Sequence, residues 1–316
     1  MSVYRDTTFF GLLCGVLALL VLASTIGWAL SRRVVNDTDR ATVDNINARI
    51  RAWWVMALVF TLSVATGALG SIFLFTFISF LALREFVTIA PTRPADHRAL
   101  FWCFFVVTPF EYGLIWMGWY GLFSILIPVY VSIFVAIRTV LARDTERFLE
   151  RTAITQWGLV ICVYFVSYVP ALLMLRIPAY EHQNAKLMFF LVLVVELSDI
   201  LQYLWGKSIG DRRIAPSISP NKTWAGFLGG AVSATAAGAA IWWATPFGPG
   251  QAAVMAFVVT MMGFSGGLVM SAIKRDRGVK DYGSMINGHG GVLDRIDSLC
   301  FAAPVFFHLT RFFFAQ

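Results

Sequence analysis

The chain has 316 residues, of which 58% are hydrophobic and only 14% are charged, and its formal net charge is +7. A water-soluble domain of this length could not bury so much apolar surface, so the composition predicts a protein whose solvent is a lipid bilayer. The basic excess indicates loops beside a membrane. It does not indicate a nucleic-acid partner, because the sequence has no basic helix with interleaved base-reading residues.

Ten apolar segments follow one another along the chain, each close to the length that a helix needs to cross a membrane. They cover residues 8–30, 52–68, 70–84, 99–117, 119–137, 153–175, 186–205, 225–244, 251–272 and 298–314. Only the four residues 67–70 separate the second segment from the third. The sequence therefore predicts an all-α polytopic membrane protein with about ten transmembrane helices.

The loops between these segments alternate between two kinds. The charged kind is found at 31–51, 85–98, 138–151, 206–224 and 273–297, and the nearly uncharged kind at 67–70, Gly118, 176–185 and 245–250. The cations that lie clearly on the uncharged side are Arg5, Arg176, Lys186 and Arg311. Because basic loops stay in the cytoplasm, we expect the charged loops there, both termini outside, and a multi-pass protein of the bacterial inner membrane.

The first charged loop, 31–51, has a helical periodicity. Its apolar residues recur on one face, at Val43, Ile46, Ile50 and Trp53. This pattern predicts an amphipathic helix that lies on the membrane surface and links the first two spans.

Acidic residues appear within the seventh apolar segment. Glu196, Asp199 and Tyr203 are spaced i, i+3 and i+7, so they share one helix face. A carboxylate within a span usually faces the protein interior, pairs or binds an ion. Because both acids lie near the cytoplasmic end, extension of the side chain toward water explains them as well, and Asp199 is the stronger functional candidate.

The next loop leads into the eighth segment through Ser219-Pro220-Asn221-Lys222-Thr223. Ser219, Pro220 and Asn221 resemble a helix start with capping chemistry. Backbone N–H groups there, together with Lys222 and Thr223, could hold a phosphate oxygen. A capped helix with a flanking lysine explains the same residues equally well.

The segment from Ser271 to Asp297 holds five Lys or Arg, four Asp, one His and five Gly. Asp281, Asp294 and Asp297 supply hard oxygen ligands, the type that Mg²⁺ prefers when it also binds substrate phosphates. The cations that could neutralise phosphate charge are Lys274, Arg275, Lys280 and Arg295.

The glycines of this segment, Gly288, Gly290 and Gly291, allow the backbone to approach a bulky anion closely. Asp294 and Asp297, at i and i+3, would face the same way at the start of the tenth helix. These parts suit phosphoryl or nucleotidyl transfer, which depends on positioning and electrostatic stabilisation. The sequence has no cysteine pair, paired-histidine helix or Ser/His/Asp elbow that would indicate another chemistry.

The same segment resembles the signature of the phosphatidate cytidylyltransferases, also called CDP-diglyceride synthases. That signature reads Ser-x-apolar-Lys-Arg, four residues, Lys-Asp-x-small, and later His-Gly-Gly-apolar-x-Asp-Arg-apolar-Asp. It falls on Ser271, Lys274-Arg275, Lys280-Asp281, Gly283, His289-Gly290-Gly291 and Asp294-Arg295-x-Asp297. Upstream, the resemblance includes Leu83–Phe86, Asp199, Tyr203, Gly206 and the box from Ser219 to Gly226.

The resemblance implies the reaction CTP + phosphatidate → CDP-diacylglycerol + pyrophosphate, with Mg²⁺ required and a second metal ion compatible. The implied metal ligands are Asp199, Asp281, Asp294 and Asp297. The implied catalytic residues are Asp281, His289, Asp294, Asp297, Lys274 and Arg275. The implied phosphate-binding residues are Ser219, Asn221, Lys222, Thr223, Lys280, Gly290, Gly291 and Arg295. Because a lipid phosphate is already ionised near neutral pH, we expect His289 to position phosphate rather than act as a base.

On this reading the chain divides at residue 68. Residues 1–68 hold the first span, the amphipathic cytoplasmic linker and the second span, and residues 69–316 form the membrane-embedded catalytic region. We expect the site within 196–316, on the cytoplasmic side of the C-terminal helices. CTP and phosphatidate are the expected substrates, and a homodimer is compatible with the sequence.

Two departures from the family pattern leave alternatives open. Gly267 stands where many members carry an acidic residue, and Asn287 where Pro, Gly or Ser is usual. A related enzyme that acts on a different lipid phosphate or alcohol is therefore the main alternative. A transporter or a catalytically silent membrane partner is a further alternative. A transporter would need a continuous polar pathway across the spans. Apart from Glu111, the acidic residues within the spans cluster toward the cytoplasmic side, so that pathway is broken.

Overall fold

The structure is a computed structural model that describes residues 7–33, 37–285 and 290–315. The helices are α1 (Thr7–Arg33), α2 (Asp37–Ala65), α3 (Ala68–Ile89), α4 (His97–Trp102), α5 (Thr108–Met117), α6 (Tyr120–Ile125), α7 (Ser132–Val140), α8 (Phe148–Leu159), α9 (Val166–Ala171), α10 (Asn184–Ile209), α11 (Trp224–Ala240), α12 (Pro249–Asp276) and α13 (Leu293–Phe314). Short helical turns join them at η2 (Pro94–Asp96), η3 (Cys103–Val107), η4 (Leu126–Val131), η5 (Val160–Phe165), η6 (Leu172–Met174) and η7 (Trp242–Ala244). A hairpin of β1 (Arg213–Ala215) and β2 (Ser219–Thr223) joins α10 to α11.

Nine helical stretches in the described ranges are long and apolar enough to cross a membrane. They are Phe10–Arg32, Ile46–Ala65, Ala68–Ile89, Pro94–Met117, Tyr120–Val140, Phe148–Met174, Asn184–Ile209, Pro249–Asp276 and Leu293–Phe314. The protein is therefore an all-α polytopic membrane protein, as the apolar segments predict. The break predicted between the second and third segments is present, since α2 ends at Ala65 and α3 begins at Ala68.

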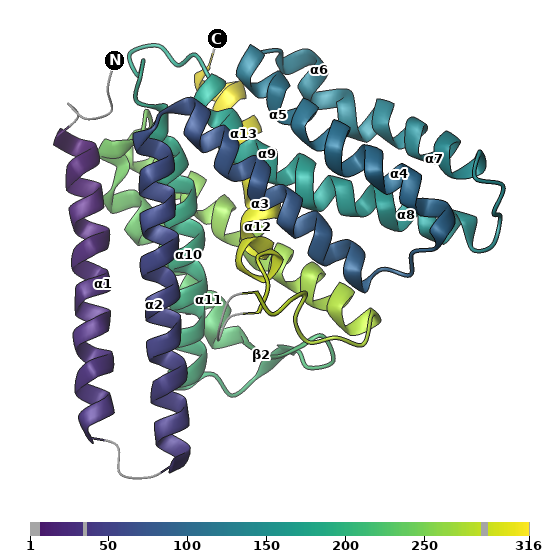
Figure 1. The fold of residues 1–316 in the computed structure, drawn as a ribbon. Coiled ribbons are helices and arrows are strands. Elements are labelled where there is room, and N and C mark those ends of the chain that lie inside the picture. Colours follow the sequence, from purple (N-terminus) through teal and green to yellow (C-terminus); the bar gives the residue numbers. More distant parts are fainter. Residues whose placement is uncertain (1–6, 34–36, 286–289, 316) are drawn as a thin grey trace.

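A tenth crossing is made by α11, whose 17 residues keep it just below the length of the other spans. The backbone carbonyl of Ile218, just before β2, accepts a hydrogen bond from Arg275 at the end of α12. The carbonyl of Ala244, just after α11, accepts one from Tyr180, which precedes α10. The two ends of α11 thus lie on opposite faces of the bundle, and the start of α1 and the end of α13 lie on the same face (Figure 1).

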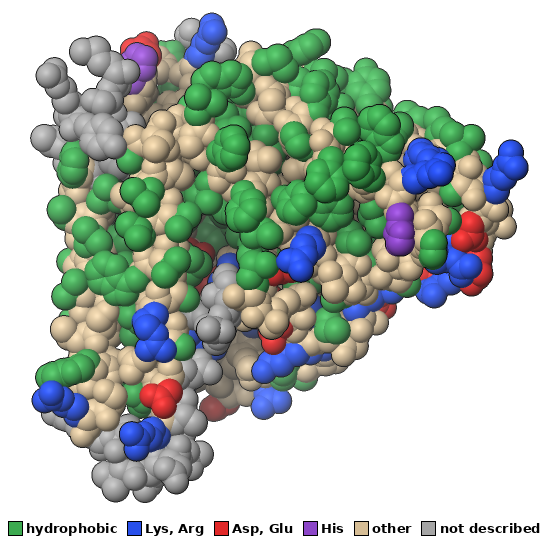
Figure 2. All heavy atoms as spheres, viewed as in Figure 1, with side chains coloured by type: hydrophobic (Ala, Val, Ile, Leu, Met, Phe, Trp, Pro, Cys, Tyr) green, Lys and Arg blue, Asp and Glu red, His purple; other side chains and the backbone are tan. Residues whose placement is uncertain are grey.

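Apolar side chains cover the flanks of the molecule, and most lysine, arginine and acidic side chains gather along its lower and right edges (Figure 2). Large side chains on the flank are strongly exposed, for example Phe73 at 79% and Phe77 at 59%. A surface of this kind is stable only against lipid. We call the edge that holds the charged loops the charged face, and the edge that holds both termini the opposite face.

The first charged loop differs from its prediction. Residues 37–65 form one continuous helix, so the amphipathic part is the first half of α2 and not a separate helix on the membrane surface. Val43 and Ile50 are buried, each 7% exposed. A Cβ at Gly27 of α1 would meet Asn47 and Ile50, so this apolar face packs against α1. The predicted apolar face is present, but it packs against a neighbouring helix and not against lipid.

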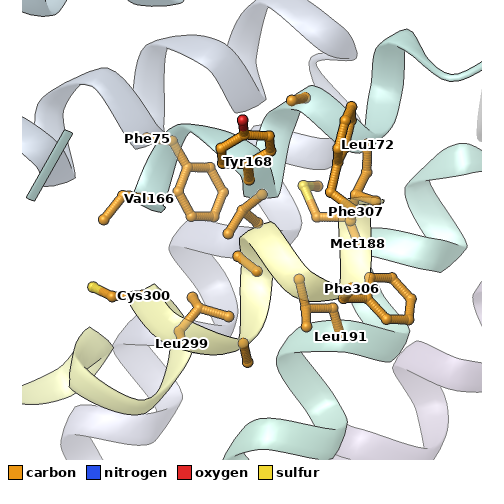
Figure 3. Close-up of a cluster of buried hydrophobic side chains, with 14 of the residues drawn as sticks. Phe75, Val166, Tyr168, Leu172, Met188, Leu191, Leu299, Cys300, Phe306 and Phe307 are labelled. Carbon is orange, nitrogen blue, oxygen red and sulfur yellow. The ribbon is translucent and has the colours of Figure 1, made fainter. Parts of the chain in front are cut away.

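The core surrounds α13, which passes through the centre of the bundle. Phe306 and Phe307 are fully buried among side chains of α3, α9 and α10, including Phe75, Tyr168 and Met188 (Figure 3). The rings of Phe190 and Phe306 stack with centroids 5.9 Å apart. Because α13 is held so tightly along its length, the positions of its first two turns are fixed, and these turns carry Asp294 and Asp297.

Candidate active site

The first turn of α13 is tied to its surroundings by Asp294. Oδ2 of Asp294 accepts hydrogen bonds from the backbone N–H groups of Tyr282, at 2.8 Å, and Gly291, at 2.9 Å. Oδ1 accepts one from Nζ of Lys274 at the end of α12, at 2.8 Å. In this ion pair the lysine side chain is only 12% exposed and the aspartate side chain only 5%. Asp294 therefore holds α12, the connecting loop and α13 together through charge-assisted bonds.

Glu85 of α3 reaches the same helix end from across the bundle. Its Oε1 accepts a hydrogen bond from the N–H of Val292 at 2.9 Å, and its Oε2 accepts one from Leu293 at 2.8 Å. The residue is 6% exposed. The first N–H groups of a helix have no intrahelical partner, and the helix dipole favours a negative charge there. Glu85 thus satisfies the start of α13 with a buried carboxylate.

Two glycines of the signature make this approach possible. A Cβ at Gly283 would lie 2.7 Å from Oε1 of Glu85, and one at Gly291 would collide with the same carboxylate. In the sequence, Glu85 falls within the Leu83–Phe86 resemblance, which implies no role for it. No local signal could have indicated one, because the residues that it binds lie 207 and 208 positions away.

A second polar cluster lies one turn further along α13. Oγ of Ser298 donates a hydrogen bond to Oδ2 of Asp199 on α10, at 2.8 Å. The backbone N–H of Ser298 donates to Oδ1 of Asp297, at 2.7 Å. Asp199 is exposed on the protein surface and Asp297 is half-buried, and both carboxylates belong to membrane-crossing helices.

Lys222 of β2 enters this cluster from the hairpin. Its Nζ lies 4.5 Å from the ring centroid of Phe264 and 3.4 Å from the carbonyl oxygen of Phe264. A Cβ at Gly267 would lie 2.8 Å from this Nζ and 3.5 Å from Oγ of Ser298. The absence of a side chain at Gly267 therefore leaves room for the ammonium group beside Ser298.

Electrostatics link the two clusters. Burial lowers the pKa of Lys222 below that of an ordinary lysine, while the charges of Asp199 and Asp297 oppose this effect and that of Lys274 adds to it. Glu196 lies within electrostatic reach of Asp199 and Asp297. Carboxylates and ammonium groups from α10, β2, α12 and α13 thus share one region, and Figure 2 shows acidic and basic side chains recessed in the hollow beside α2.

The oxygen donors can be compared with the needs of Mg²⁺. Among the residues whose placement is described, no group of three or more His, Cys, Asp or Glu side chains is arranged to hold a metal ion. Asp199 and Asp297 nevertheless meet through Ser298, and Mg²⁺ commonly uses one or two carboxylates together with substrate phosphates. This pair fits a metal ion that the substrate helps to bind. Asp294 fits less well, since both of its oxygens already accept hydrogen bonds.

The remaining acidic candidate, Asp281, lies beside Asp294. A Cβ at Gly290, whose φ is +80°, would lie 2.8 Å from Oδ2 of Asp294 and 3.3 Å from Cβ of Asp281. Asp281 is exposed. The four predicted metal ligands thus form two neighbouring pairs, one at the loop and one between α10 and α13.

Several predicted phosphate-binding residues have other contacts. Arg275 donates from Nε to the carbonyl of Ile218 and from Nη1 to that of Val279, both at 3.2 Å, so it joins the signature loop to the hairpin. Lys280 and Asn221 are exposed, whereas Ser219 and Arg295 are half-buried. His289 and Asn287 lie outside the described residues.

The hairpin corrects one local prediction. Ser219, Pro220 and Asn221 belong to strand β2, which pairs with β1, and do not start the eighth helix. The helix begins at Trp224, and Thr223 is its N-cap, whose side chain accepts a hydrogen bond from the N–H of Gly226 at 3.1 Å. The extended backbone of Thr223, with φ −119° and ψ 156°, ends the strand and caps the helix at once.

Comparison with known proteins identifies the family. The model of the cytidylyltransferase family matches residues 47–313, from within α2 to the end of α13. Phosphatidate cytidylyltransferase of Bacillus subtilis (strain 168) is 28% identical over 276 residues, 85% of this chain and 99% of that protein. Phosphatidate cytidylyltransferase of Brucella abortus biovar 1 (strain 9-941) is 43% identical over 120 residues, 37% of this chain and 44% of that protein.

A third relative covers nearly the whole chain. It is the Escherichia coli (strain K12) protein named "Uncharacterized protein YnbB", 38% identical over 306 residues, 95% of this chain and 97% of that protein. The family match extends over most of the chain and includes every element that contributes to the two polar clusters. This protein is thus a membrane-embedded nucleotidyltransferase that belongs to the cytidylyltransferase family.

Proposed function

We propose that the protein transfers the cytidylyl group of CTP to phosphatidate, forming CDP-diacylglycerol and pyrophosphate. The observation that carries this proposal is the meeting of Asp199, Lys222, Lys274 and Asp297 where the end of α12 and the start of α13 lie beside α10 and the hairpin. A lipid headgroup and a water-soluble nucleotide can both reach such a place. The names of the Bacillus and Brucella relatives, both phosphatidate cytidylyltransferases, support the same substrate pair.

In the proposed reaction an oxygen of the lipid phosphate attacks the α-phosphorus of CTP. One P–O bond forms, the bond to the β-phosphate oxygen breaks, and pyrophosphate leaves with the electron pair. The attacking oxygen is already ionised, so the protein has to position two polyanions and offset their charge. Lys222, Lys274, Lys280 and Arg295 would bind phosphate oxygens, and His289 would position one of them.

Mg²⁺ bound by Asp199 and Asp297 would neutralise charge on the phosphates of the nucleotide. Asp294 would act mainly by holding Lys274 in place, through the 2.8 Å contact between Oδ1 and Nζ. Glu85 would fix the start of α13, and with it the direction of Asp297. We further propose that the charged face lies in the cytoplasm of a bacterial inner membrane, where CTP is available.

The proposal is tested with purified protein in mixed micelles of detergent and phosphatidate. Labelled CTP should yield a lipid-linked cytidylyl product, and a chelator should abolish turnover until Mg²⁺ is restored. Asp297→Asn should lower kcat roughly 100-fold or more, since it removes one of the two carboxylates proposed to hold Mg²⁺. Asp276→Asn is the matched control, because Asp276 lies on the surface, 3.0 Å from Arg277.

Absence of labelled lipid with folded protein and Mg²⁺ present would overturn the proposal. One observation favours a second candidate, an enzyme of the same chemistry with a different lipid phosphate or alcohol as acceptor. Gly267 leaves the space beside Lys222 without a side chain, so the acceptor can differ in shape there. Competition among phosphatidate, other lipid phosphates and lipid alcohols separates the two candidates.

A further inference from the structure

A cavity of about 400 Å³ opens on the opposite face, far from the polar clusters. It lies between the start of α3, the turn from α5 to α6, the segment after α9 and the end of α13. Two of the few cations on this face, Arg176 and Arg311, line it together with Trp116, Tyr120 and Phe307.

Among the described residues that line this cavity, none is acidic. Within residues 7–33, 37–285 and 290–315, no ion pair includes Arg176 or Arg311. The guanidinium carbon of Arg311 lies 3.7 Å from the centroid of the Tyr120 ring. That ring stacks in turn on Phe307, with centroids 6.0 Å apart and an interplanar angle of 21°. Arg311 is therefore held over an aromatic platform at the cavity, and its N–H donors are available to a ligand.

The cavity lies at the depth of lipid headgroups. Trp116 and Trp119 beside it are each 57% exposed, and such aromatic residues mark the interface between bilayer and water. Below the cavity, α3 presents an exposed apolar column of Leu69, Phe73 and Phe77. A second cavity, of about 770 Å³, shares Arg176 and the neighbouring Leu173–Leu175 segment with the first.

We propose that this cavity binds an anionic phospholipid, with Arg176 and Arg311 on the headgroup phosphate and an acyl chain along the exposed column of α3. The planar guanidinium group matches phosphate oxygens in pairs, and basic pockets between membrane helices suit lipid headgroups. The site is separate from the transfer reaction, because it lies at the other face of the bundle. It does not depend on the proposed function.

Native mass spectrometry of the full-length protein in mild detergent tests the proposal. Phosphatidylglycerol should stay bound and raise the melting temperature, and phosphatidylcholine should do so much less. Arg176→Gln/Arg311→Gln should weaken retention of phosphatidylglycerol about tenfold or more. Arg98→Gln/Arg138→Gln is the matched control at the charged face and should retain the lipid like the wild type. Unchanged retention by the first double variant would overturn the proposal.

A second variant distinguishes loss of lipid binding from loss of folding. Ala68→Trp adds bulk at an exposed residue that lines both cavities, so it should displace phosphatidylglycerol while both arginines remain. Retention of the lipid in this variant would contradict the location. Inorganic phosphate at the lipid's concentration should not compete; if it protects the protein equally, the lipid assignment is wrong.

Discussion

At the scale of single residues, the site depends on side chains that are missing as much as on those present. Gly267 makes space for the ammonium group of Lys222, and Gly283 and Gly291 make space for the carboxylate of Glu85. In the sequence, Gly267 is only a departure from the family pattern. Its contact with Lys222 explains why a side chain there changes the site directly.

Gly267→Ala should lower kcat/KM for CTP about tenfold, because the new Cβ would lie 2.8 Å from Nζ of Lys222 and displace it. Stability should change little, since the atom that must move is the end of a flexible side chain. Gly263→Ala, one turn earlier on α12, is the matched control, because its Cβ would make an ordinary 3.5 Å contact. Equal activity of the two variants would contradict the role of Gly267.

Glu85→Gln should destabilise the protein by about 1–3 kcal/mol, because one N–H group at the start of α13 loses its acceptor and the charge at the helix end is lost. Hydrogen exchange of the amides of Val292 and Leu293 should accelerate. The matched control is Glu146→Gln, since the Glu146 side chain is 62% exposed. Unchanged exchange at these two amides would show that Glu85 does not cap the helix.

At the scale of elements, the neighbouring helices decided which surface each helix face contacts, and local sequence patterns could not. The apolar face of residues 43–50 is real, but whether it contacts lipid or another helix depends on α1 lying beside it. The start of α8 gives a second example. Arg151 is 2% exposed there, with its Nε 3.3 Å from Asp96 and its Nη1 3.0 Å from Asp144. This buried ion pair joins the loop before α4 to α8.

Arg151→Met should destabilise the protein by about 3–5 kcal/mol, because it leaves the carboxylate of Asp96 buried without its cation. The double variant Arg151→Met/Asp96→Asn should recover part of this loss. Thermal unfolding of these two variants and of the single variant Asp96→Asn in detergent measures the coupling. If the double variant were as unstable as the sum of the two single changes, the pair would not be coupled.

At the scale of the whole molecule, the path of the chain fixes its topology. With α11 added to the nine long apolar stretches of the described residues, the number of crossings is even, so the end of α13 lies on the same face as the start of α1 (Figure 1). The 17 residues of α11 are about 26 Å long, slightly less than a bilayer core. Its small residues compensate by allowing close packing: a Cβ at Gly238 would collide with Ala256 of α12, and one at Gly230 with Gln202 of α10.

Thiol labelling of intact bacteria tests the orientation that we propose. In a Cys14→Ser background, Glu181→Cys on the opposite face should react with an impermeant reagent from outside the cell. Ser217→Cys on the charged face should react only after the membrane is opened. Both residues are exposed, so accessibility within the protein does not distinguish them. The reverse pattern would place the charged face outside.

The sequence by itself determined the membrane class, the positions of the spans and the chemistry of the signature, because hydropathy and residue type are local properties of the chain. Only the tertiary structure decided which residues meet. It grouped Asp199 with Asp297 and Asp281 with Asp294, brought Lys222 to Ser298, and placed Glu85 at the start of α13. Such contacts join residues tens to hundreds of positions apart, and they arise from packing between helices, which leaves no periodicity in the sequence.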